Sequence, residues 1–201
     1  MGRLGIKIIF TLAALALPMF TLASPANAEV PGCTQARSFV NTVSAKITGA
    51  LRSRTGRKQK FARVFKRYAD LYGMANFALG RYARTLPKSK KSEYYRLAEN
   101  MVVHMLSSQM GAVKGRSYKI WKCSPHGAGF AINGAIVEAN GNMVITVHWR
   151  LKATRRGLKV ADLSVAHLWL TQQQRSSFRT VMSRNNGDIN ALFAHMRKKA
   201  S

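Results

Sequence analysis

The stretch AINGAIVEANGNMVITVHWRL, residues 131–151, decides the fold class of this chain. Asn140-Gly141 is a strong signal for a two-residue hairpin turn between two strands. Beyond this turn the residues alternate between apolar and polar, which is typical of a strand with one buried face. The pattern predicts an antiparallel hairpin whose buried face holds Ile145, Val147 and Trp149.

The strand pattern extends on both sides of this hairpin, from residue 116 to about 168. Residues 118–121 predict a strand before it, and Arg156-Gly157 supplies a further turn before a last strand over 158–168. Gly134 lies inside the second strand, at a position where a bulge is expected. Together these segments predict an antiparallel meander of about four strands.

Helical periodicity fills most of the remaining chain, because apolar residues recur there every three or four positions. Gly73 is expected to interrupt the helical pattern, and Leu86-Pro87 is expected to stop it. The order of the segments predicts an α+β fold, with helices packed on one face of the antiparallel sheet. The expected helices cover residues 35–51, 61–72, 74–85, about 90–110, 171–185 and 189–196.

The first 28 residues have the pattern of a secretory signal peptide. A positively charged start precedes an apolar run at 8–22, and Ala-Asn-Ala at 26–28 matches the cleavage pattern. The apolar run is too short to cross a bilayer core of ~30 Å. We therefore expect residues 1–28 to be removed and residues 29–201 to form a single exported domain.

The chain is strongly basic, with 33 Lys and Arg against 7 Asp and Glu and a formal net charge of +26. An exported protein meets membrane surfaces, where each basic residue near anionic headgroups contributes about 1 kcal/mol. Helical phasing turns the aromatic side chains inward and the lysines outward, so nucleic acid is not an expected partner. The alternative to a membrane-binding surface is a merely solvated one. The basic clusters lie at 52–60, 88–91, 155–156 and 197–199.

Two cysteines, Cys33 and Cys123, remain after cleavage and reach an oxidising compartment. A disulfide between them would close a loop of roughly 90 residues and contribute ~4–5 kcal/mol in the chain-entropy model. Pairing requires the two Cα atoms to lie within ~7 Å, which the sequence alone leaves open. A lipidated Cys33 is the competing interpretation, and Pro31 disfavours it.

Few residues have the spacing of a catalytic or metal site. The carboxylates are scattered, no Gly-x-Ser-x-Gly elbow is present, and the cysteines lack zinc-ligand spacing. His148 and His167 on neighbouring strands could form half a metal site, or they are ordinary surface histidines. An enzyme would have only these two and Asp162 for a polar centre. We therefore expect no enzyme, no metal and no cofactor.

Large, soft apolar side chains come from several of the expected helices and strands. They either fill the core completely, or the helices and a curved sheet fail to close and leave an apolar cavity for a ligand. Composition alone does not separate these two arrangements.

Three stretches of the chain resemble one known family. Residues 65–85, FKRYADLYGMANFALGRYART, are similar to its aromatic-rich helix followed by Leu-Gly and an aromatic residue two places on. Residues 147–168, VHWRLKATRRGLKVADLSVAHL, resemble its strand pair, and residues 174–196 resemble its closing helices. The family is MlaC, also called the toluene-tolerance auxiliary family. The resemblance covers about residues 36–199.

The resemblance implies a periplasmic carrier with an NTF2-like or cystatin-like cone and an apolar pocket for a phospholipid or a related lipid. The lipid would be cargo rather than cofactor. The implied partners are an outer-membrane lipoprotein complex, an inner-membrane ABC transporter with an MCE-domain subunit, and the anionic membrane surface. The alternative is a basic, envelope-binding structural protein with a filled core.

The segments expected to face each other across helix and sheet give a set of candidate lipid-binding residues. If the basic clusters serve docking, we expect them to form one continuous patch around the mouth of the pocket, with Lys88, Lys90 and Lys91 among them. The candidate wall residues are Tyr72, Phe77, Leu79, Tyr82, Met101, Met105, Ile132, Val147, Trp149, Val165 and Leu168.

Overall fold

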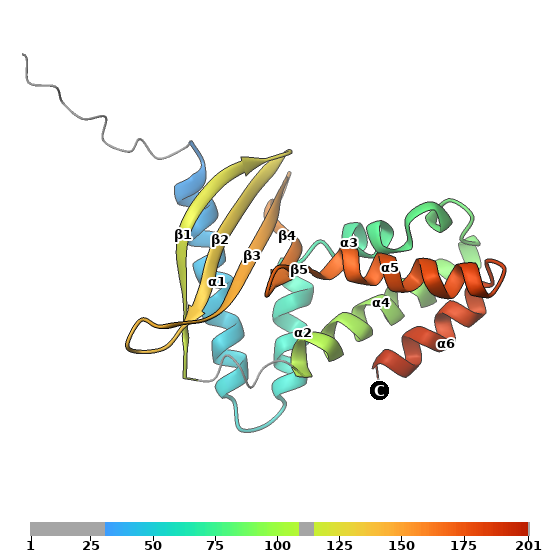
Figure 1. Cartoon of the computed structure of the whole chain (residues 1–201), viewed down its shortest axis with the longest axis horizontal. Coiled ribbons are helices and arrows are strands. Elements are labelled where there is room, and N and C mark those ends of the chain that lie inside the picture. Colours follow the sequence, from blue (N-terminus) through green and yellow to red (C-terminus); the bar gives the residue numbers. More distant parts are fainter. Residues whose placement is uncertain (1–30, 109–114, 201) are drawn as a thin grey trace, which may run out of the picture.

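A computed structural model describes residues 31–108 and 115–200 of the chain (Figure 1). The predicted signal peptide, residues 1–28, lies outside these ranges. In the described part, six α-helices and one short 3-10 helix accompany a five-stranded antiparallel sheet. The α+β class predicted from the sequence is confirmed. No helix within these ranges combines the length and the apolar character needed to cross a membrane.

The sheet is a simple meander in which each strand pairs with the next one along the chain. All four pairings are antiparallel. The predicted hairpin is present, but five residues, 138–142, connect its strands rather than two. The Glu138 N–H donates to the Asn142 carbonyl at 3.0 Å, and Gly141 has a φ of +88°. The strands are β1 (Ser117–His126), β2 (Gly129–Val137), β3 (Met143–Thr154), β4 (Gly157–Val165) and β5 (Leu168–Trp169).

The prediction of one last strand over residues 158–168 is wrong at its end. Ala166 and His167 both have positive φ, 48° and 67°, and so form a tight turn after Val165. The chain reverses there and β5 pairs back onto β4. The sheet consequently has five strands rather than about four.

The bulge expected at Gly134 lies on the neighbouring strand instead. Ile120 pairs with Gly134 and Lys122 with Asn133, so Trp121 of β1 is the extra residue. A Cβ atom on Gly134 would lie 2.4 Å from the Tyr118 hydroxyl oxygen. Glycine is therefore needed so that the Tyr118 ring can cross β2, where its hydroxyl donates to the Val147 carbonyl of β3 at 2.9 Å.

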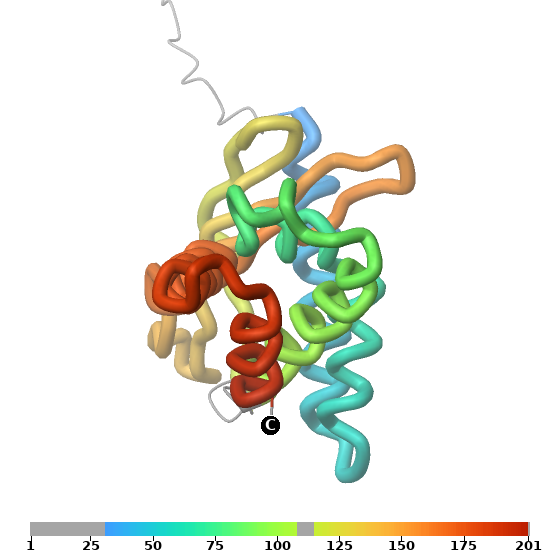
Figure 2. The backbone as a smooth tube through the Cα atoms, turned by 90° about the vertical axis from the view of Figure 1, so that its right-hand side faces the viewer, coloured from blue at the N-terminus to red at the C-terminus, as the bar shows by residue number. Residues whose placement is uncertain are grey.

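The inner face of the sheet is covered by α1 (Cys33–Arg52) and α2 (Arg57–Tyr68) (Figures 1 and 2). A disulfide joins Cys33, at the start of α1, to Cys123 of β1, with the Cα atoms 5.9 Å apart. The prediction that one inner face holds Ile145, Val147 and Trp149 is confirmed: Val147 is 6% and Trp149 5% exposed.

The helix predicted over 61–72 ends four residues earlier than expected. Ala69 is extended, and the N–H of Asp70 donates to the Val160 carbonyl of β4 at 2.8 Å. The Asp70 carboxylate then accepts from the Gly73 N–H and caps α3 (Leu71–Leu79). The break therefore lies at Asp70, and Gly73 is inside the new helix.

The remaining helices gather beside the sheet and form a second core of their own (Figures 1 and 2). Buried Tyr94, Phe178 and Phe193 lie at its centre, and the Tyr94 hydroxyl donates to the Ala75 carbonyl of α3 at 2.6 Å. The first core lies between the sheet, α1 and α2. The remaining helices beside the sheet are the 3-10 helix η1 (Gly80–Ala83), α4 (Lys88–Ser108), α5 (Leu170–Arg184) and α6 (Ile189–Ala200).

Candidate functional site

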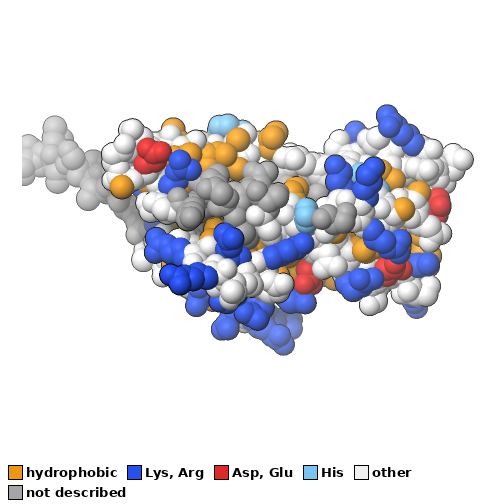
Figure 3. Space-filling model, turned by 90° about the horizontal axis from the view of Figure 1, so that it is seen from below, with side chains coloured by type: hydrophobic (Ala, Val, Ile, Leu, Met, Phe, Trp, Pro, Cys, Tyr) orange, Lys and Arg blue, Asp and Glu red, His pale blue; other side chains and the backbone are white. Residues whose placement is uncertain are grey.

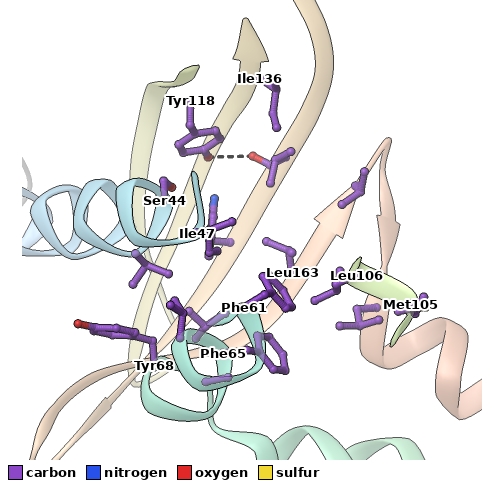
Figure 4. A pocket seen from close by; sticks show the side chains of 18 of the residues that line it. Ser44, Ile47, Phe61, Phe65, Tyr68, Met105, Leu106, Tyr118, Ile136 and Leu163 are labelled. Atoms are coloured by element: carbon purple, nitrogen blue, oxygen red, sulfur yellow. Dashed lines mark hydrogen bonds between the residues drawn. The ribbon is translucent and has the colours of Figure 1, made fainter. Parts of the chain in front are cut away.

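A cavity of about 320 Å³ lies between the inner face of the sheet and the helices that cover it (Figure 4). Ile47 comes from α1, Phe61 and Phe65 from α2, and Leu163 from β4. Met105 and Leu106, near the end of α4, close another part of the wall. Helices and sheet thus fail to close fully over the first core, which favours the cavity over the filled core.

The wall of this pocket is uncharged. No Asp, Glu, Lys, Arg or His is among the described residues that line it. Most of the lining side chains are aliphatic or aromatic, and they come from α1, α2 and the sheet. Such a surface favours burial of hydrocarbon, because apolar area leaves water on contact. It offers no acid, base or nucleophile pair for chemistry on a ligand.

Five of the eleven predicted wall residues lie in the wall of the pocket. Ile132, a sixth, is fully buried in the first core but is not among the lining residues. The alternation of β3 and the helical phase at the end of α4 therefore indicated which of their residues face the cavity. The five are Met105, Val147, Trp149, Val165 and Leu168.

The other five predicted wall residues lie elsewhere. Leu79, Tyr82 and Met101 belong to the second core. Tyr72 is 61% exposed and stacks on Tyr95 of α4, away from the cavity. Phe77, 44% exposed, packs beneath the Arg175 guanidinium. Tyr72, expected at the end of the helix over 61–72, belongs instead to α3, which begins after the break at Asp70, so its direction does not follow the phase of α2.

Sequence reasoning missed the helical half of the wall, which α1 and α2 supply. Val43, Ile47, Phe61 and Phe65 all line the cavity. The same periodicity that predicts these helices marks their apolar faces. It cannot show, however, whether such a face meets another side chain or a void.

Several polar side chains interrupt the apolar wall, among them Tyr118, Trp149 and Ser44. Burial raises the pKa of the Tyr118 phenol, and the nearby indole N–H of Trp149 acts in the opposite sense. That N–H does not reach hydrogen-bond geometry with Tyr118, and the two rings meet edge to face. Trp149 Nε1 and the Ser44 hydroxyl are both buried without a hydrogen-bond partner among the described residues.

The candidate enzyme centre lies on the opposite face of the sheet from the pocket. His148 alternates with Val147 and Trp149 along β3, and its ring lies 5.5 Å from that of His167. The described residues bring no third metal ligand to these two histidines. Asp162 accepts the Thr171 N–H at 3.1 Å and the Thr171 hydroxyl at 2.7 Å, and so holds the start of α5.

A basic rim adjoins the pocket at the connection between α1 and α2. Leu51 and Phe61, which flank this connection, both line the cavity. Figure 3 views the molecule from this side and shows Lys and Arg side chains gathered on it. The rim comprises Arg52, Arg54, Arg57, Lys58 and Lys60.

The second basic cluster is not at the pocket. Lys88, Lys90 and Lys91 lie in the first turn of α4, whereas the pocket contacts α4 only at Met105 and Leu106. The 14 residues from Lys91 to Met105 span about 21 Å of helix. The expectation that this cluster borders the mouth is therefore wrong.

A model of the family described as MlaC protein matches residues 37–198. The chain belongs to the MlaC family. Among solved structures, this MlaC chain is similar to the phospholipid-binding protein from Ralstonia solanacearum, solved in complex with a phospholipid. The two share 18% sequence identity with a TM-score of 0.69 over 83% of this chain and 95% of that chain. At this identity the likeness establishes the fold. No curated protein matches the MlaC chain significantly in sequence.

Proposed function

We propose that this MlaC family member binds a phospholipid, or a related lipid, in the uncharged pocket and carries it across the periplasm. The observation that carries the proposal is a cavity of about 320 Å³ with no charged residue in its described wall. Family membership supports it, and so does the similar protein from Ralstonia solanacearum, which is described as phospholipid-binding. The predicted signal peptide supports the periplasmic location.

Transport by such a carrier needs shielding rather than bond chemistry. Moving an acyl chain into water costs ~0.8 kcal/mol per methylene, so two chains of about 15 methylenes cost of the order of 20 kcal/mol. A pocket that buries part of these chains removes part of that cost. Because the bilayer buries them equally well, loading and unloading are near balance, and no catalytic step is required.

We propose that direction is set by partners: an outer-membrane lipoprotein complex on one side and an inner-membrane ABC transporter with an MCE-domain subunit on the other. The basic rim at the α1–α2 connection would attract the anionic membrane surface during transfer. Leu51 and Phe61, which flank this connection, line the pocket, so attraction there would bring the cavity toward the bilayer.

Native mass spectrometry of the mature protein, purified gently from the periplasm, tests the proposal. We expect a population heavier by the mass of one lipid, and lipid extraction should identify that lipid. A wash in high salt supplies the control, because lipid held only by surface charge is released by screening whereas lipid in the pocket is retained. Protein that is consistently empty, or that loses all its lipid in salt, would favour the envelope-binding alternative.

A further inference from the structure

Two buried polar atoms in residues of the pocket wall have no hydrogen-bond partner among the described residues. The Ser44 hydroxyl belongs to α1 and the Trp149 indole N–H to β3, and both residues line the cavity. Trp149 is only 5% exposed, so water outside the protein does not solvate it. A buried, unsatisfied donor costs about 1–3 kcal/mol, and most such groups in proteins find a partner. This pair therefore points to a ligand atom.

The neighbouring Tyr118 narrows the chemistry of that atom. Its single hydroxyl proton is donated to the Val147 carbonyl, so Tyr118 has no proton left for a ligand. In Figure 4 the Tyr118 side chain comes from β1 and the Ser44 side chain from α1, and both residues line the pocket. The indole N–H can only donate, and the Ser44 hydroxyl is free to do so. The missing group must then be a hydrogen-bond acceptor.

We propose that Ser44 and Trp149 form a polar subsite that donates hydrogen bonds to an uncharged acceptor oxygen of the cargo, the carbonyl of an acyl ester. This inference rests on the proposed lipid-binding function and specifies the class of lipid. The oxygen is uncharged because no Lys, Arg or His is among the described wall residues to balance a carboxylate. The free energy needed to bury an unpaired carboxylate would be far larger than the stabilisation from hydrogen bonds with two neutral donors.

Acyl oxygen could come from an ester lipid or from a free fatty acid. The uncharged wall separates these two sources, because a fatty acid is ionised at neutral pH and an ester is not. The subsite therefore selects diacyl lipids over free fatty acids at neutral pH. It also selects them over ether lipids, whose chains carry no carbonyl.

Competition binding with a matched pair of lipids tests the inference without any variant. The probes are diester and diether phosphatidylglycerol with the same chain lengths, added to delipidated mature protein. We expect the diester to bind about tenfold more tightly, which is 1.4 kcal/mol. Palmitate at pH 7.4 should bind more weakly than the diester. Tighter binding of palmitate would overturn the assignment of an uncharged oxygen.

Substitutions then assign the preference to the two donors. Trp149→Phe keeps an aromatic ring but removes the N–H, and Ser44→Ala removes the hydroxyl. Each should reduce the diester preference, and the double variant should bring it near one. Ile47→Val, on the same helix as Ser44 and in the same wall, is the control and should affect both lipids alike.

Two results would overturn the subsite while leaving lipid binding intact. One is equal affinity of the wild-type protein for both lipids, which would mean that the donors serve buried water or no ligand. The other is an ester preference that persists in the double variant. Failure of the wild-type protein to bind either lipid would overturn the proposed function itself, together with the subsite.

Discussion

Breaking the Cys33–Cys123 disulfide should lower the free energy of unfolding by about 4–5 kcal/mol. The bond joins residues 90 positions apart in sequence. In the chain-entropy model, closing such a loop removes about 15 cal/mol/K of entropy from the unfolded chain, or about 4.6 kcal/mol at 25 °C. For a domain of this size the melting temperature should fall by roughly 10–18 °C.

The bond also fixes one wall of the pocket. It anchors the first turn of α1 to β1, and α1 carries Val43, Ser44 and Ile47 of the wall. Without it, the covalent anchor between α1 and the sheet is lost. We therefore expect the reduced protein to release bound lipid faster than the oxidised protein, under conditions where both remain folded.

Urea unfolding of the mature protein with and without reductant measures the stability difference, and tryptophan fluorescence follows it because Trp149 is buried. At a slope of about 2 kcal/mol/M, the midpoint should fall by about 2 M. The double variant Cys33→Ala, Cys123→Ala should resemble the reduced protein and should not respond to reductant. A shift below about 1 kcal/mol would refute the reasoning, because it would show that the unfolded chain gains little freedom from the broken bond.

Three further predictions concern the pocket, pH and charge. Met105→Lys should empty the pocket of lipid in native mass spectrometry, whereas Tyr72→Lys, on an exposed side chain outside the pocket, should retain it; equal occupancy would place the lipid elsewhere. Burial and neighbouring His167 lower the pKa of His148 below its ordinary 6.5. As the pH falls, the unfolded chain therefore takes up this proton at a higher pH than the folded chain does. Stability should thus be full above about pH 6.5 and decline as the pH falls below it, and His148→Gln should flatten this dependence of the urea midpoint on pH; an unchanged slope would assign it to other groups. Reversing the rim charges should slow lipid transfer to anionic vesicles at low salt, whereas reversing the three lysines of the 88–91 cluster should not, and equal rates would exclude docking by the rim. The rim residues to change are Arg52, Arg54 and Arg57.

The sheet was the most predictable part of the structure, since a period of two and local turn residues determine it directly. Val147 and Trp149 lie on the buried face, as the alternation of β3 requires. The turn at Ala166-His167 was missed because alanine rarely adopts a positive φ, although histidine does so more often than most residues. The positive φ angles of this turn, which local residue preference disfavours, occur together with the pairing of β5 to β4.

The pocket was less predictable than the sheet. Met105 was placed correctly from helical phase, but Met101, one turn earlier on α4, faces the second core. A single helix that packs against two cores changes its environment along its length. The spacing of apolar residues does not show which core each turn contacts. The break at Asp70 shows the same limit, because a hydrogen bond to the distant Val160 carbonyl accompanies it.

The bulge at Trp121 has a consequence for the behaviour of the sheet toward other copies of the chain. Within the described sheet β1 pairs only with β2, so its outer backbone groups could template a further strand. The extra residue breaks the spacing of those groups, Pro125 lacks an N–H, and exposed Lys119 and Lys122 add like charge. At the opposite edge, β5 is only two residues long. Neither edge of the described sheet is thus both long and regular, and both edges are poor templates for a strand from another copy of the chain.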